Sequence, residues 1–157
     1  MKERNPFDLL RDEQGTSLIE LALIFPLFVL LLLGAVDFGR AYYLAIEVAG
    51  AAHAGAVYGS QHPTDTAGMQ NAAQDDAPNV PNLSVPTPTY GCECADGSNY
   101  SANCSTAPTS ICSSINLNVV NRVNVTVNAT YTPLLPWPGW HSSTTLTSSA
   151  SMRSAGS

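Results

Sequence analysis

The sequence predicts an α+β fold, in which a long N-terminal transmembrane helix continues into a small antiparallel sheet domain with two disulfides. Three features support this prediction: a long apolar run near the N-terminus, a strict alternation of apolar and polar residues late in the chain, and a cluster of four cysteines. The composition is 45% apolar and only 11% charged, whereas soluble domains carry about 25% charged residues. We therefore expect one segment to lie in lipid.

The apolar run covers residues 16–36, 21 residues with Glu20 as the only charge. As a helix it extends about 31 Å, enough to cross the hydrocarbon core of a bilayer. Its strongly apolar side chains contribute about −4 to −8 kcal/mol to insertion, whereas one acid costs at most about 3 kcal/mol. The run is also longer than the core of a secretory signal peptide, which has about 7–15 residues. A membrane anchor is the better interpretation.

The basic residues indicate how this anchor is oriented. Lys2, Arg4 and Arg11 precede the apolar run, and Arg40 follows it. Basic residues favour the cytoplasmic side of a membrane. We therefore expect a single pass with a cytoplasmic N-terminus and an extracytoplasmic C-terminal domain.

The helical pattern continues beyond the apolar run to Gly59, giving one helix over residues 16–59 that is about 65 Å long. Small residues recur on one of its faces, three or four positions apart. Such a face lets helices or sheets approach closely, and it is expected to pack either against sister subunits or against the sheet of the same chain. Its members are Ala45, Ala49, Ala52, Ala56 and Gly59.

Residues 60–157 form the predicted extracytoplasmic domain. A short helix is expected from Thr64 to Ala77, with Thr64 or Asp65 as N-cap and Pro78 as the stop. Four prolines then predict an extended or looped segment over residues 78–88. Residues 119–131 alternate strictly between apolar and polar and predict a half-buried strand. A rigid aromatic loop over residues 133–140 and a last strand over residues 144–152 complete the domain.

Cys92, Cys94, Cys104 and Cys112 predict two disulfides formed in an oxidising compartment. Their spacing, C-x-C-x9-C-x7-C, differs from the two close doublets of a typical zinc site. Cys92 and Cys94 share one face of an extended strand, so each needs a different partner. Two pairings remain open: 92–112 with 94–104, or 92–104 with 94–112.

The charges and motifs exclude several classes of function. Without its first fifteen residues the chain has three basic and eight acidic residues, a net charge of −5, which does not suit nucleic acid. None of the three histidines has a metal-ligand spacing, and motifs for catalysis or nucleotide binding are missing. We expect no enzyme activity, no metal and no cofactor. Trp137 and Trp140 would either contact another subunit or cap the sheet edge.

A short motif precedes the apolar run. Gly15 and Thr16 are followed by a helix with Glu20 five residues after the glycine, which resembles the processing site of type IV prepilins. In that family a membrane-embedded peptidase cuts after the glycine on the cytoplasmic side. The resemblance implies that residues 1–15 are a leader, that cleavage falls between Gly15 and Thr16, and that Glu20 pairs with the freed α-amine to set assembly and registry.

The resemblance becomes narrower further along the chain. Residues 36–43 read VDFGRAYY, an Ala/Gly-rich helix follows, and the C-x-C pair, the Val-rich strand and a final SSASMR complete the likeness. This order is similar to the TadE-like pseudopilins of tight-adherence (Flp-type) pilus and secretion systems. One departure is Leu21, where the family commonly has an aromatic residue.

This resemblance implies a minor pseudopilin of the bacterial inner membrane that enters or primes a pilus at the cell surface. Its implied partners are a prepilin peptidase, other pilin or pseudopilin subunits, and the pilus assembly platform with its ATPase. An alternative is an unprocessed, membrane-anchored module whose extracytoplasmic domain binds a ligand. That alternative keeps residues 1–15 and does not depend on Glu20.

Overall fold

The computed structural model describes residues 13–104, 107–115, 117–134 and 143–154. The chain separates into two compact units, one ending at Arg40 and the other beginning at Ala41. Residues 1–12 of the predicted leader, which spans residues 1–15, lie outside the described residues. Most of the aromatic loop, with Trp137 and Trp140, lies outside them as well.

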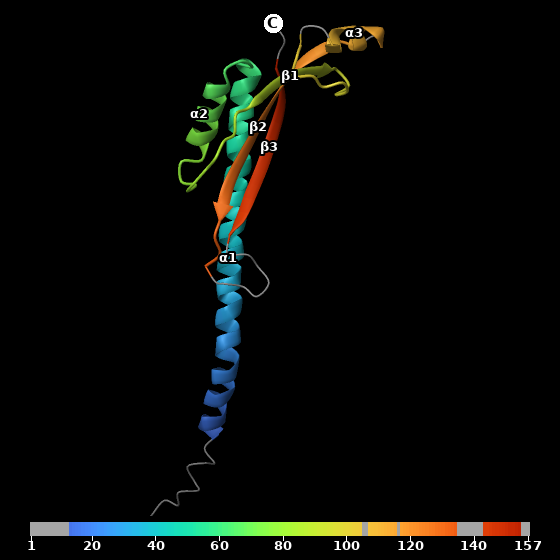
Figure 1. Ribbon diagram of the computed structural model, residues 1–157. Helices are drawn as coiled ribbons and strands as arrows, with labels where there is room; N and C mark the ends of the chain where they lie inside the picture. Colours follow the sequence, from blue (N-terminus) through green and yellow to red (C-terminus); the bar gives the residue numbers. More distant parts are fainter. Residues whose placement is uncertain (1–12, 105–106, 116, 135–142, 155–157) are drawn as a thin grey trace, which may run out of the picture. The chain divides into compact units, whose positions relative to one another are not determined.

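The predicted long helix is confirmed as α1, Glu13–Gln61, which passes through Pro26 without interruption (Figure 1). Membrane helices tolerate an internal proline because neighbouring groups satisfy the freed carbonyl. Residues 13–40 of α1 belong to the first unit, and residues 41–61 belong to the second. The helix ends just before Pro63, which disfavours a helical conformation of the residue before it.

The predicted second helix is also confirmed, as α2, Thr66–Asp76. Its N-cap is Asp65, whose Oδ1 accepts a hydrogen bond from the backbone N–H of Gly68 at 2.9 Å. The Tyr58 hydroxyl donates to Oδ2 of the same carboxylate at 2.7 Å. These two hydrogen bonds hold the pKa of Asp65 below its ordinary value, and the bond from Gly68 has the larger effect. The cap thereby joins the end of α1 to the start of α2.

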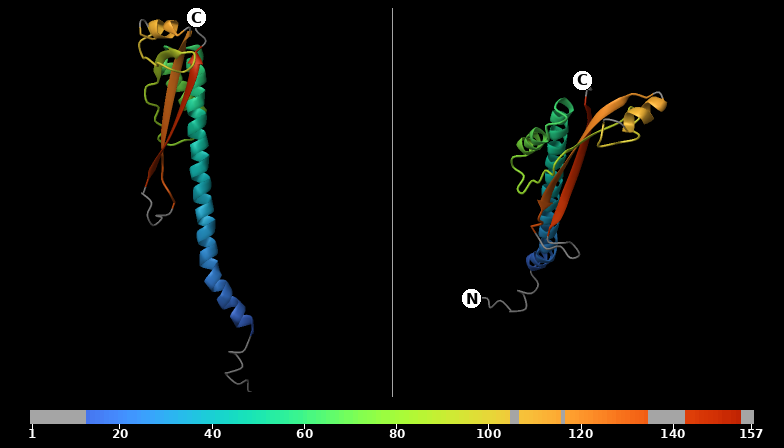
Figure 2. Two further views of the ribbon diagram at one scale, coloured as in Figure 1. Left: turned by 90° about the vertical axis from the view of Figure 1, so that its right-hand side faces the viewer. Right: turned by 45° about the horizontal axis from the view of Figure 1, so that its top comes forward.

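Three antiparallel strands form the sheet, in the order β1-β2-β3 (Figure 2). They are β1, Thr89–Cys94; β2, Val119–Tyr131; and β3, Thr144–Ser154. A third helix, α3, Ala107–Ser114, lies between β1 and β2 in the sequence. The β2–β3 register runs without a break from Asn121↔Ser154 to Tyr131↔Thr144. Both predicted strands are confirmed, β2 with the predicted bounds and β3 two residues longer.

The hydrophobic core of the second unit lies between one face of the sheet and the two helices α1 and α2. Its β2 members are the residues that alternate with the polar ones, as the sequence predicts. The proline-rich segment contributes Val80 and Val85 and is tied down by a pair of backbone hydrogen bonds between Ser84 and Asn128, 2.8 Å each. The remaining buried members are Val48, Ala51, Ala52, Ala56, Met69, Ala73, Ala77, Val123, Val125, Val127 and Ala129.

The small residues of α1 divide between two environments. Ala52, Ala56 and Gly59 are buried in the second unit, whereas Ala45 and Ala49 are exposed. The buried members therefore pack against the sheet and α2 of the same chain, which is one of the two roles that the sequence left open. Of these five small residues, only Ala45 and Ala49 are exposed and available to a neighbouring subunit.

Candidate functional site

The first unit presents an apolar helix whose large side chains have little protein around them. The leucine, isoleucine and phenylalanine residues from Leu18 to Leu33 are 39–74% exposed, with Leu33 the least and Leu23 the most exposed. The helix is long and apolar enough to cross a membrane, and its apolar part is not buried within the chain. Because so much apolar surface in water is unfavourable, lipid or the helices of other subunits must cover it.

The predicted site residues occupy the beginning of this helix. Gly15 and Thr16 lie in its first turn, and Glu20 lies one turn later. Glu20 is exposed, and no ion pair involves it among the residues that the structure describes. Residues 16 and 20 are four apart and so share one face of the helix. Glu20, the only carboxylate of the apolar run, therefore follows Thr16 by about one helical turn.

A second acidic residue marks the other end of the apolar run. Asp37 has a side chain that is 5% exposed and pairs with Arg40 at 3.8 Å, one turn further along α1. Arg40 itself is half exposed. The VDFGRAYY motif therefore includes an ion pair within one helical turn, where the helix leaves its apolar segment.

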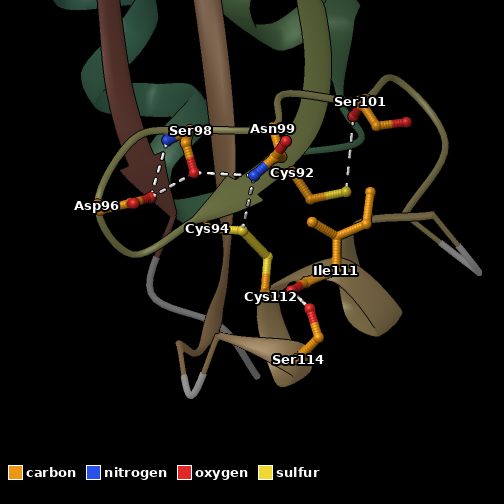
Figure 3. Close-up of a disulfide and its surroundings, with 9 residues drawn as sticks. All are labelled: Cys92, Cys94, Asp96, Ser98, Asn99, Ser101, Ile111, Cys112 and Ser114. Atoms are coloured by element: carbon orange, nitrogen blue, oxygen red, sulfur yellow. Dashed lines mark hydrogen bonds between the residues drawn. A yellow bond between two sulfur atoms is a disulfide. The ribbon is translucent and has the colours of Figure 1, made fainter.

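The four cysteines form two disulfides, Cys92–Cys104 and Cys94–Cys112. This is one of the two pairings that the sequence left open. As expected, Cys92 and Cys94 both lie on β1 and bond to different partners. The Cys94–Cys112 bridge joins β1 to α3, as Figure 3 shows. Next to it, a turn at Asp96–Gly97 closes through hydrogen bonds from Ser98 to the Asp96 carboxylate. The Cys94–Cys112 disulfide thus holds α3 against β1, whereas Cys92–Cys104 joins β1 to the segment before α3.

A buried charge cluster lies on the opposite face of the same strands. Glu93 has a side chain that is only 3% exposed and accepts hydrogen bonds from Arg122 at 2.7 Å and from Arg153 at 3.2 Å. Burial raises the pKa of Glu93, but the bonds and charges of the two arginines outweigh it and hold the pKa below its ordinary value. Sequence reasoning missed this cluster. The sequence pattern that could have indicated it is Cys92-Glu93-Cys94, in which an acid alternates with two cysteines in an extended strand.

The histidines take no part in a common site. His53 is exposed, and the ring of His62 stacks on Tyr58 with centroids 4.7 Å apart. His141 lies outside the described residues. Within the described ranges, no group of three or more His, Cys, Asp or Glu side chains is placed to hold a metal ion.

These features define the class of protein: a chain with one apolar N-terminal helix, suited to a single-pass membrane anchor, and a small α+β body stapled by disulfides. Within this class, residues 15–57 match the family model described as TadE-like protein, so this part of the chain is a TadE-like domain. A search of curated proteins and a search of solved structures found no match. The domain indicates a function related to the tight-adherence (Flp-type) pilus, and proteins of this kind are structural rather than enzymatic.

Proposed function

We propose that this protein is a minor pseudopilin of a tight-adherence (Flp-type) pilus, and that a prepilin peptidase removes its leader between Gly15 and Thr16. The TadE-like match over residues 15–57 carries this proposal. In this proposal residues 1–15 are the leader, residues 16–59 anchor and assemble the subunit, and residues 60–157 form the extracytoplasmic domain.

The physical role of cleavage is to create a positively charged α-amine near the carboxylate of Glu20. A carboxylate at the edge of hydrocarbon is costly unless it is paired. Cleavage after Gly15 frees the α-amine of Thr16, one turn before Glu20 on the same helix face. This amine, from the same subunit or from a neighbouring one, neutralises Glu20. Pairing between subunits also fixes the axial position of one helix against the next.

The orientation and the partners follow from the same arrangement. The N-terminus lies in the cytoplasm, where the basic leader residues belong, and the disulfide-bonded body lies outside the inner membrane, where cysteines oxidise. The exposed apolar side chains of α1 are then covered first by lipid and later by other pilin or pseudopilin subunits. Extraction from the membrane needs the assembly platform and its ATPase.

The first experiment is the intact mass and N-terminal sequence of the protein from native membranes. We expect the chain to begin at Thr16. A Gly15→Val variant should keep its leader, whereas Gly39→Val is the matched control, because a Cβ atom at Gly39 meets nothing within 4 Å. A native chain that retains Met1 would contradict the proposal and favour an unprocessed, membrane-anchored binding module.

The second experiment tests the carboxylate. Glu20→Gln keeps the size of the side chain and removes its charge, and we expect pilus formation to fall at least tenfold while the protein still inserts. Asp75→Asn makes the corresponding change at an exposed carboxylate of α2, outside residues 16–59, and should leave pilus formation unchanged. Normal piliation with Glu20→Gln would show that the charge has no role in assembly.

A further inference from the structure

The polar residues that follow the apolar run show where α1 leaves the hydrocarbon of a bilayer. Residues 16–36 extend about 31 Å as a helix, which matches a hydrocarbon core of about 30 Å. The next helical turn carries the Asp37–Arg40 ion pair, with the side chain of Arg40 50% exposed. Charged groups are expensive in hydrocarbon. The hydrocarbon core therefore ends before Asp37.

Two adjacent tyrosines follow this ion pair on the same uninterrupted helix. Tyr42 is 72% exposed, the most of any large apolar side chain that the structure describes in the second unit, and Tyr43 is 56% exposed. The third tyrosine of α1, Tyr58, differs from them, because its hydroxyl donates to Asp65 within the second unit. The protein's own body thus leaves Tyr42 and Tyr43 uncovered, although exposed aromatic surface is unfavourable in water.

Their distance from the apolar run places both rings at the level of the lipid headgroups. Tyr42 follows Val36 by six residues, so its Cα atom lies about 9 Å further along the helix. Side chains of a helix lean toward its N-terminus and cover the preceding turn. The two rings therefore reach back to about 4–9 Å beyond the run, and the headgroup layer of one leaflet is about 5–8 Å thick.

We infer that Tyr42 and Tyr43 bind the lipid headgroup layer where α1 leaves the membrane. The inference rests on the proposed function, which supplies the single-pass anchor and makes this the extracytoplasmic leaflet. Tyrosine suits this layer because its ring is apolar and its hydroxyl is polar. The rings contact the upper part of the acyl chains, and the hydroxyls bond to ester and phosphate oxygens. Arg40 lies at the same level, and its guanidinium suits a lipid phosphate.

A helix of another subunit is a poorer partner for the two tyrosines. Helices that pack in or near a membrane approach each other through small residues, and a large ring that projects from the helix keeps a neighbour away. The exposed small residues of α1 in the second unit, Ala45 and Ala49, lie further along the helix. A neighbouring helix would contact those alanines, whereas lipid, which is fluid, can surround a projecting ring.

The test measures the depth of single tryptophans in vesicles that contain the purified full chain at high dilution in lipid. The chain has two tryptophans, Trp137 and Trp140, and both are replaced by phenylalanine. One tryptophan is then introduced, as Tyr42→Trp, Leu27→Trp or His53→Trp, and all three sites are exposed. The phosphatidylcholine of the vesicles is brominated near the carbonyl end or near the methyl end of its acyl chains. Bromine quenches tryptophan fluorescence only at short range.

The three variants should differ in which lipid quenches them. In Tyr42→Trp we expect bromines near the carbonyl end to quench at least about twofold more strongly than those near the methyl end. Leu27 lies about 14 Å before the end of the run, near the bilayer centre, so Leu27→Trp should show the reverse order. His53 lies about 25 Å beyond the run, so His53→Trp should be quenched by neither lipid.

The adjacent variant Tyr43→Trp repeats the measurement at a second position and should behave as Tyr42→Trp does. Two results would overturn the inference. If Tyr42→Trp and Tyr43→Trp stay unquenched while Leu27→Trp is quenched, water or protein surrounds the tyrosines. If bromines near the methyl end quench them more strongly, the tyrosines lie within the hydrocarbon.

The same experiment separates a failure of the inference from a failure of the proposed function. Leu27→Trp without quenching by either lipid would contradict the membrane anchor itself, and the inference with it. Quenching of Leu27→Trp alone would contradict the headgroup contact and leave the anchor in place. Removal of the leader is read from the N-terminus and is independent of each of these results.

Discussion

Glu93 is a buried carboxylate that accepts hydrogen bonds from two arginines on neighbouring strands. Its neighbours in β1 are Cys92 and Cys94, whose side chains lie on the opposite face of the strand. Glu93 of β1 therefore links β1 to β2 and β3 on the polar face of the sheet. The cysteines that form the disulfides lie on the opposite face of β1. A buried charge is tolerated only when it is paired, and both oxygens of Glu93 have a partner.

We predict that Glu93→Gln lowers the free energy of unfolding by about 1–3 kcal/mol. The cost stays below the about 3–5 kcal/mol of a fully buried pair, because Arg122 and Arg153 are 37% and 52% exposed and regain water. Chemical denaturation under oxidising conditions measures the change. Asp75→Asn, an exposed site, should stay within about 0.5 kcal/mol of the native protein.

The pKa of Glu93 also predicts a dependence of stability on pH. Since the pKa of the folded protein lies below the ordinary value of 4.5, the unfolded chain takes up its proton first as the pH falls. The contribution of Glu93 is complete above about pH 4.5 and is lost as the pH falls through the lowered pKa. Denaturation curves of native protein and Glu93→Gln at several pH values should therefore converge in acid. A constant difference would contradict this assignment.

At the scale of elements, the close contact between α1 and α2 depends on a glycine, which has no side chain. A Cβ atom at Gly55 would lie 2.9 Å from the carbonyl oxygen of Met69 and 3.0 Å from Cγ1 of Val125. Both distances are shorter than normal van der Waals contacts, and the first involves the backbone of α2. Gly55 therefore sets how closely the second helix approaches the first.

We predict that Gly55→Ala destabilises the body by about 1–2 kcal/mol. Overpacking costs about 1–3 kcal/mol, and alanine returns up to about 1 kcal/mol of helix propensity. Thermal unfolding followed by circular dichroism measures the net effect. Gly50→Ala is the matched control on the same helix: its nearest atom, 3.0 Å away, is a carboxylate oxygen of the exposed Asp76, which can rotate. A stabilised Gly55→Ala variant would show that α2 shifts without cost.

At the scale of the whole molecule, the second unit is held together in two different ways. The buried hydrophobic core includes residues of α1, α2 and β2, but none of the α3 residues whose burial the structure describes, 111–114. The described part of α3 buries only Cys112 and leaves Ile111 44% exposed. Hydrophobic burial therefore stabilises the helix–sheet core, whereas the Cys94–Cys112 disulfide holds α3.

This division predicts a local response to loss of a disulfide. In the variant Cys94→Ser/Cys112→Ser, the lost constraint amounts to about 3 kcal/mol for a loop of this length. Limited proteolysis with mass spectrometry should show cleavage within residues 95–118 about a hundredfold faster than in native protein, while β2 and β3 stay intact. Equally fast cleavage in β2 would mean that the core also depends on this bridge.

Much of the fold could be predicted because local patterns specify it. The apolar run and the alanine-rich pattern after it predict α1 to within a few residues, the Asp65 cap and Pro78 bracket α2, and the alternation of valine with polar residues gives β2 its bounds. The Cys92–Cys94 spacing limited the disulfides to two pairings. The Gly15–Glu20 spacing predicted the candidate processing site, and residues 15–57 match the family that this spacing and the VDFGRAYY motif suggested.

The sequence by itself determined the elements that depend on short-range periodicity: the anchor helix, α2, the two long strands and a disulfide-bonded body. Only the tertiary structure decided which residues meet across those elements, because such contacts depend on strand order and register rather than on spacing along the chain. It selected the disulfide pairing, assigned Ala52, Ala56 and Gly59 to the protein's own core, and placed Glu93 between two arginines.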